Sequence, residues 1–105
     1  MIARLTDTNK IFDFIQNNAF VVLVFADECF FNILTSELKN SYSTVSVLFI
    51  PMSEDIAIDM QVIRYPQFRI YQDGHEVYQV VGKQYFSKVI KDYEQKCRDT
   101  TSSRS

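Results

Sequence analysis

The sequence predicts an α/β fold in which helices flank both faces of a central mixed sheet of about four or five strands. Three observations support this fold class. Helical and strand-like segments alternate along the chain. The uninterrupted apolar run at 20–26 is typical of a strand that is buried on both faces. The Asp73-Gly74 pair between two apolar segments predicts a β-hairpin. A parallel strand–helix–strand unit followed by an antiparallel hairpin makes the sheet mixed.

The first half of the chain contains two predicted helices with a strand between them. A helix is expected at 8–17, where Asp7 or Thr8 can serve as the N-cap and apolar residues recur at helical spacing. The strand at 20–26 follows. The next helix, at 30–40, comes after two acidic residues, which favour a helix N-terminus.

The second half supplies the remaining strands and helices. Pro51 ends a buried strand, and Ser53 can cap the short helix that follows. The Asp73-Gly74 turn joins two strands, and a final helix presents one apolar face to the core. These elements are predicted as strands at 45–50, 68–71 and 77–81 and as helices at 53–60 and 84–98.

Length and charge narrow the class of protein. The chain has 105 residues, enough for one domain and too few for two. A content of 47% hydrophobic and 14% aromatic residues excludes a disordered chain. The net charge of −2 gives no overall attraction to nucleic acid or anionic lipid.

The apolar run Ala19–Ala26 is shorter than the roughly 20 residues of a membrane span. We expect a cytoplasmic protein with one domain at 1–98 and a flexible polar tail at 99–105.

Few residues are suited to metal or cofactor chemistry. The two cysteines, Cys29 and Cys97, are too few for a disulfide framework or a four-ligand zinc site. The single histidine, His75, argues against a histidine-based metal cluster or catalytic triad. We therefore predict no metal and no cofactor. Cys97 is expected to be a small core residue, and His75 a surface residue without a role.

The element order and several local sequences resemble the thioredoxin family. The stretch VVLVFADECFFNILTSELKN, at 21–40, is similar to the strand, active-site loop and helix of that family. Tyr65-Pro66, Asp73-Gly74 and Gly82 match its cis-proline step, its hairpin turn and the glycine before its last helix. The resemblance implies a thioredoxin-like fold in which Cys29 occupies the nucleophile position beside Pro66. It also implies that the backbone of Tyr65 pairs with a bound peptide by strand addition.

Several positions depart from the family pattern. Asn32 stands where the family has its second, resolving cysteine, so the motif is Cys-x-x-Asn. Glu28 replaces the tryptophan that usually precedes the first cysteine, and Leu23 replaces the buried acid. Because Asn32 offers Cys29 no sulfur, the intramolecular disulfide cannot form. The conventional dithiol–disulfide oxidoreductase cycle is therefore excluded for this chain acting alone.

Two interpretations of Cys29 follow. At a helix N-terminus the unpaired N–H groups and the helix dipole favour a reactive thiolate, whereas the adjacent acids Asp27 and Glu28 oppose it. The thiol is thus either a reactive monothiol or an inert cysteine. Asn32 either donates a hydrogen bond to it or faces solvent. Phe30 and Phe31 either leave one ring exposed as an apolar contact for a partner or both fold into the core.

The sequence favours a divergent thioredoxin-like protein that engages partners through Cys29 and the cis-proline groove. The candidate nucleophile is Cys29, and the candidate binding residues are Phe30, Phe31, Asn32, Tyr65 and Pro66. The expected partner is a protein, a peptide or glutathione, with no nucleic acid and no membrane, and the sequence gives no indication of oligomeric state. The alternative is a redox-inactive binding or scaffold module. A third possibility is a domain of a larger protein in which a neighbour completes the site.

Overall fold

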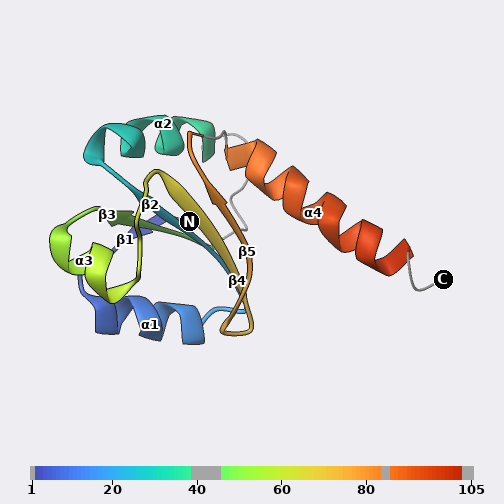
Figure 1. Ribbon diagram of the computed structural model, residues 1–105, viewed down its shortest axis with the longest axis horizontal. Coiled ribbons are helices and arrows are strands. Elements are labelled where there is room, and N and C mark those ends of the chain that lie inside the picture. The colour runs from blue at the N-terminus through green and yellow to red at the C-terminus, as the bar shows by residue number, and fades with distance from the viewer. Residues whose placement is uncertain (1, 39–45, 84–85, 103–105) are drawn as a thin grey trace.

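The protein folds around a five-stranded mixed sheet with the strand order β1-β3-β2-β4-β5 (Figure 1). The computed structural model describes residues 2–38, 46–83 and 86–102. In chain order the elements are β1 (Ile2–Arg4), α1 (Thr8–Gln16), β2 (Phe20–Ala26), α2 (Glu28–Leu38), β3 (Ser46–Pro51), α3 (Glu54–Asp59), β4 (Gln67–Gln72), β5 (His75–Val81) and α4 (Phe86–Ser102).

Strand β2 has a parallel neighbour on one side and an antiparallel neighbour on the other. Strand β3 runs parallel to both β1 and β2, and the β2-to-β3 crossover contains α2. On its other edge β2 pairs with β4 in antiparallel register, and β4 pairs with β5 through the hairpin. The predicted combination of a parallel unit and an antiparallel hairpin in one sheet is confirmed.

Helices cover both faces of the sheet, as the sequence predicts. Strand β2 alternates its side chains between two apolar clusters, and all residues from Val21 to Ala26 are fully buried. The face formed by Val22, Val24 and Ala26 packs against α2 and α4. The opposite face, which includes Leu23 and Phe25, packs against α1 and α3 (Figure 1). Among the helices that the structure describes, none combines the length and apolar character that a membrane span needs.

The predicted caps and turn are present. The Asp7 carboxylate accepts hydrogen bonds from two backbone N–H groups in the first turn of α1, and Ser53 Oγ accepts the N–H of Ile56 in α3. Asp73 and Gly74 have φ values of 52° and 83°, in the left-handed region that a tight hairpin turn requires. The Asp73 N–H also donates to the Ala19 carbonyl, at 2.8 Å, and so ties the hairpin to the start of β2.

One strand was not predicted, and several predicted boundaries were wrong: β3 includes Pro51, for example, and β5 begins at His75, two residues earlier than predicted. Strand β1 was not predicted, because three residues show no alternation and its hydrogen bonds come from β3, far along the chain. Helix α2 begins at Glu28, two residues earlier than predicted, because the Asp27 carbonyl already accepts the Phe30 N–H at 3.1 Å. Helix α4 continues to Ser102, into the predicted tail, since no glycine or proline stops it there. The predicted residues at 39–40, 45 and 84 lie outside the described residues.

Candidate functional site

An exposed thiol lies beside a cis proline. Cys29 stands in the first turn of α2 and is exposed, and the Tyr65–Pro66 peptide bond is cis. Both residues line one cleft of about 240 Å³, which we call the thiol cleft. Its lining residues are Asp27, Cys29, Phe30, Ile33, Tyr65, Pro66 and Lys83. The structure thus brings Cys29, Phe30, Tyr65 and Pro66 together, whereas Phe31 and Asn32 lie outside the lining.

The loop after β5 contributes the far wall of the thiol cleft. The N–H of Gly82 donates to the Pro66 carbonyl, at 2.8 Å, and holds this loop against the start of β4. Gly82 has a φ of 110°, which a residue with a side chain rarely adopts. The next residue, Lys83, is thereby placed in the lining of the cleft. Sequence reasoning missed Lys83, although its position directly after Gly82 was a usable signal.

Charges of both signs surround the thiol. Asp27 and Lys83 both line the cleft and are exposed. Glu28, which precedes the thiol, forms an ion pair with Arg4 of β1. Both side chains of this pair are about half exposed, so solvent screens it and its contribution to stability is small. The pair nevertheless offsets part of the negative charge that the sequence places beside Cys29.

The two phenylalanines after Cys29 both fold into the molecule. Phe30 is buried and meets the Phe68 ring edge to face, with centroids 5.9 Å apart. Phe31 packs on Phe49 in the same way, at 4.9 Å. The exposed apolar side chain beside the thiol is Ile33, which was not predicted and is 54% exposed. The spacing of Phe30 and Leu34, four residues apart on the buried face, was the available signal.

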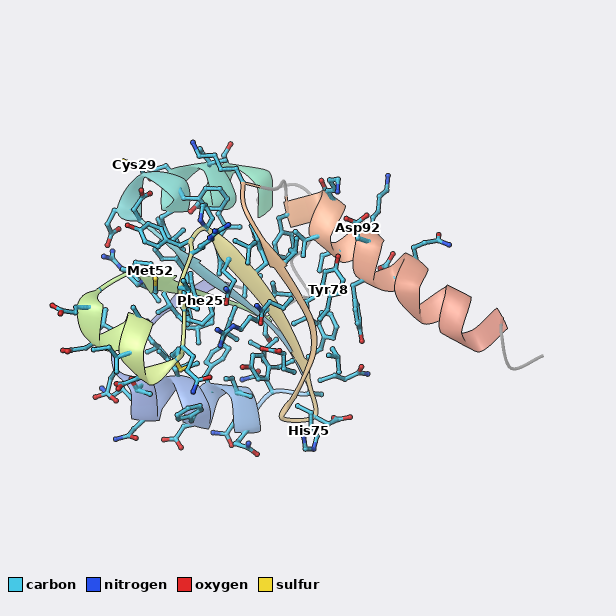
Figure 2. All side chains as sticks on the ribbon, in the orientation of Figure 1. Phe25, Cys29, Met52, His75, Tyr78 and Asp92 are labelled. Carbon is cyan, nitrogen blue, oxygen red and sulfur yellow. The ribbon has the colours of Figure 1, made fainter. Side chains whose placement is uncertain are left out.

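Asn32 is exposed on α2, and no hydrogen bond joins it to Cys29 among the described residues. A role for Asn32 at the site stays a prediction. His75 lies at the β4–β5 turn, at the lower edge of the view in Figure 2, whereas Cys29 lies at the upper edge. The side chain of Cys97 lies outside the described part of the chain. Within that part, no group of three or more potential metal ligands is arranged around a common point.

A buried arginine lies on β4, below the loop that ends at Tyr65. Arg69 is 7% exposed, and its register partner on β2 is Leu23, the residue at the position of the family's buried acid. Its Nε donates to Gln67 Oε1 at 2.6 Å and lies 3.6 Å from Glu76 Oε1. The guanidinium also stands 4.9 Å from the centre of the Phe25 ring.

The same guanidinium reaches the loop after α3. Arg69 Nη2 donates to the Gln61 carbonyl at 3.3 Å, and Gln61 itself has a φ of 55°. This hydrogen bond fixes one end of the segment at 61–65 that leads to Pro66. A charged residue in an otherwise apolar strand was visible in the sequence. Most of its partners were not, because Phe25, Gln61 and Glu76 come from β2, the loop after α3 and β5.

Comparison with known proteins is informative at the level of the fold. No known protein-family model and no curated protein sequence matches the chain. Solved structures do match it. A thioredoxin mutant from Halobacterium salinarum is 18% identical, with a TM-score of 0.73, over 90% of this chain and 88% of that chain. Thioredoxin from Plasmodium falciparum is 17% identical, with a TM-score of 0.71, over 88% and 96% of the two chains.

A third match is mitochondrial thioredoxin 3 from Saccharomyces cerevisiae, in its oxidised form. It is 21% identical, with a TM-score of 0.71, and the alignment covers 90% of this chain and 94% of that one. At these identities the likeness establishes architecture. The protein therefore has the thioredoxin fold, as its element order predicts.

Proposed function

We propose that this protein is a divergent thioredoxin-like protein that reacts with disulfides of proteins or peptides through Cys29, as a monothiol. The observation that carries the proposal is the position of Cys29. Its thiol is exposed in the first turn of α2 and shares the thiol cleft with Tyr65 and Pro66. A thiol at a helix N-terminus thus lies beside the segment that precedes the cis proline, which supports peptide binding next to Cys29.

The chemical step is thiol–disulfide exchange. The Cys29 thiol loses its proton to solvent, and the thiolate attacks one sulfur of a partner's disulfide. A bond forms between the two sulfurs, the original S–S bond breaks, and the other sulfur leaves as a thiolate that takes up a proton. The partner's disulfide is the oxidant. Because Asn32 supplies no resolving thiol, release of the partner requires attack by an external thiol such as glutathione.

The main chain of Tyr65 is available to a partner. Among the described residues, neither its N–H nor its carbonyl has a hydrogen-bond partner. An extended peptide in the thiol cleft can satisfy both groups, which is the strand addition that the resemblance implies. Ile33 and the Tyr65 ring, both more than half exposed, supply apolar contact beside it.

A redox-inactive binding module is the second candidate, and specific substitutions favour it. Leu23 cannot transfer protons, Glu28 adds negative charge next to the thiol, and Asn32 removes the resolving sulfur. On this alternative, the thiol cleft binds a partner without a covalent bond, and Cys29→Ser leaves that binding unchanged.

The test uses Cys97→Ser protein, so that Cys29 is the only thiol. The protein is mixed with a peptide disulfide of 5-thio-2-nitrobenzoate, and the adduct is followed by mass and by release of the coloured thiolate. The proposal predicts a stoichiometric adduct that glutathione reverses, and no adduct after Cys29→Ser. A folded protein that forms no adduct, although the thiol reacts after unfolding in denaturant, would refute the monothiol function and leave the binding module.

A further inference from the structure

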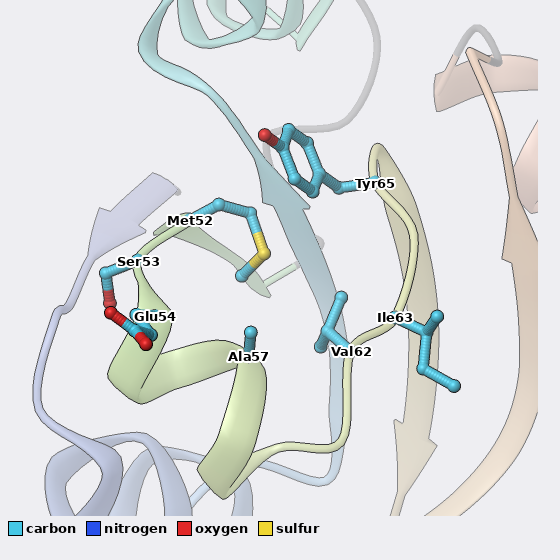
Figure 3. A pocket seen from close by; sticks show the side chains of 7 residues that line it. All are labelled: Met52, Ser53, Glu54, Ala57, Val62, Ile63 and Tyr65. Atoms are coloured by element: carbon cyan, nitrogen blue, oxygen red, sulfur yellow. The ribbon is translucent and has the colours of Figure 1, made fainter.

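A second cleft also has Tyr65 in its lining. Its volume is about 310 Å³, and we call it the α3 cleft because it is formed largely by α3 and the segments that flank it (Figure 3). The lining residues are Met52, Ser53, Glu54, Ala57, Val62, Ile63 and Tyr65. This size is at the lower end of the roughly 300–1,000 Å³ typical of ligand pockets, so it suits one long side chain better than a cofactor.

The walls of the α3 cleft are mostly hydrocarbon. Met52 extends from the segment before α3 into the cleft, with Ala57 and Val62 below it and the Tyr65 ring above (Figure 3). Ile63, at the rim, is 92% exposed. Such walls favour the methylene stem of an occupant, because burying each methylene group is worth about 0.8 kcal/mol.

The charge of the α3 cleft is of one sign. Among the described residues that line it, Glu54 is the only ionisable one apart from the Tyr65 phenol, and none is basic. Among the described residues, the Glu54 carboxylate has neither an ion-pair nor a hydrogen-bond partner. Apolar walls with an unpaired carboxylate are complementary to a lysine or arginine side chain, whose apolar stem ends in a cation.

The two clefts are connected through one residue. Tyr65 lines both the thiol cleft and the α3 cleft, and the residue is 54% exposed. A peptide paired with the Tyr65 backbone projects successive side chains to opposite sides, as in any extended strand. One of its side chains can then lie at Cys29 while a neighbouring one enters the α3 cleft.

We propose that the α3 cleft selects a basic side chain, lysine or arginine, close to the cysteine of the partner segment. Glu54 is the residue that determines this specificity. The inference rests on the proposed function, since it takes the partner to be an extended peptide in the thiol cleft. It adds the chemical class of that peptide, a cysteine with a cation nearby.

The test measures how charge near the peptide cysteine alters the rate of capture. Seven-residue alanine–serine peptides carry one cysteine, activated with 5-thio-2-nitrobenzoate. Lysine, norleucine or glutamate is placed at each of the three positions on either side. Norleucine keeps the apolar stem of lysine and lacks its charge. Each rate with the Cys97→Ser protein is divided by the rate of the same peptide with glutathione, which removes differences in intrinsic reactivity.

We expect lysine to exceed norleucine by about two- to fivefold at one or two positions, as an exposed ion pair allows, with glutamate slowest. Glu54→Gln should bring the lysine-to-norleucine ratio close to one. The matched control is Asp55→Asn, which removes the same charge from the same helical turn at a residue outside the cleft lining, and should leave the ratio unchanged.

Three outcomes would overturn the inference. They are equal rates for lysine and norleucine at every position, a lysine preference that survives Glu54→Gln, and an equal loss of preference in Asp55→Asn. If no peptide forms an adduct, the monothiol function fails separately. The same peptides with serine in place of cysteine are then titrated into isotope-labelled protein. If the lysine peptide changes the amide chemical shifts of Tyr65 and Glu54 and the other peptides do not, the result would support binding of a basic side chain in the α3 cleft. The absence of these changes would refute it.

Discussion

Replacing Arg69 tests how far a buried cation on β4 stabilises the fold. The variant Arg69→Ala removes a hydrogen bond to Gln67, which is itself 3% exposed, and a contact with the face of the Phe25 ring. Leaving a buried amide without its partner costs about 1–3 kcal/mol. The cavity left by the lost stem costs about 2–5 kcal/mol, as for other large buried side chains.

Two effects reduce the total. The variant avoids the free-energy cost of burying the charge of Arg69. In addition, water can hydrate Glu76, whose side chain is 40% exposed, once its partner is gone. We therefore expect Arg69→Ala to lower the free energy of unfolding by about 3 kcal/mol. In a domain of this size the melting temperature should then fall by about 12–24 °C.

Two further variants separate the hydrogen bond from the packing. Arg69→Met keeps most of the stem and loses the polar contacts, so it should cost about 1–2 kcal/mol. Adding Gln67→Leu removes the unpaired amide, and the double variant should return to within about 1 kcal/mol of the wild type. Urea titration with linear extrapolation measures each value. A loss below about 1 kcal/mol for Arg69→Ala, or a double variant as unstable as Arg69→Ala, would refute this reasoning.

Three further predictions concern caps, turns and pH. Asp7→Ala deletes the N-cap of α1 and should cost about 1 kcal/mol in urea titration; no change would mean that the cap is redundant. Gly74→Ala should cost about 1 kcal/mol or more, because φ is 83° there and the added Cβ would lie 3.2 Å from Gln16 Nε2; an unchanged melting temperature would contradict this. The hydrogen bond to Asp92 raises the pKa of Lys88 above its ordinary value of 10.5. From neutral pH upward, the stabilisation by the pair is therefore complete until the pH approaches the raised pKa, and it is lost as the pH rises through that pKa. The difference in melting temperature between wild type and Asp92→Asn should stay constant from about pH 7 to pH 9, and a decline within that range would contradict the assignment.

The sequence predicted the elements whose signals are local. The strand at 20–26 was correct at both ends because its apolar run is uninterrupted, and Asp73-Gly74 fixed the hairpin because few other residues adopt its backbone angles. Strand β1 was missed because nothing in its three residues distinguishes it. Only pairing with β3, more than forty residues later, makes it a strand.

The site was predicted only in part, because some of its residues are brought together by long-range packing that the local sequence does not show. The resemblance implied that Cys29 and Pro66 lie together, and they line one cleft. The rotation of α2 about its axis decides that Ile33, and not Phe31, is exposed beside the thiol, and packing against the sheet sets that rotation. No local sequence signal predicted the α3 cleft or the place of Glu54 in it, since the lining residues come from α3 and from the segments on both sides of it.

The ion pair between Arg4 and Glu28 links the edge strand of the sheet to the charge beside Cys29. Strand β1 has three residues and pairs along one side, so it opens more readily than the central strands. Each opening carries the guanidinium of Arg4 away and leaves the Glu28 carboxylate uncompensated next to Cys29. The net charge beside Cys29 therefore depends on whether β1 is paired with the sheet. Any ligand that holds β1 in place would, by linkage, keep Arg4 paired with Glu28 and so lower the net negative charge beside Cys29 without touching the sulfur.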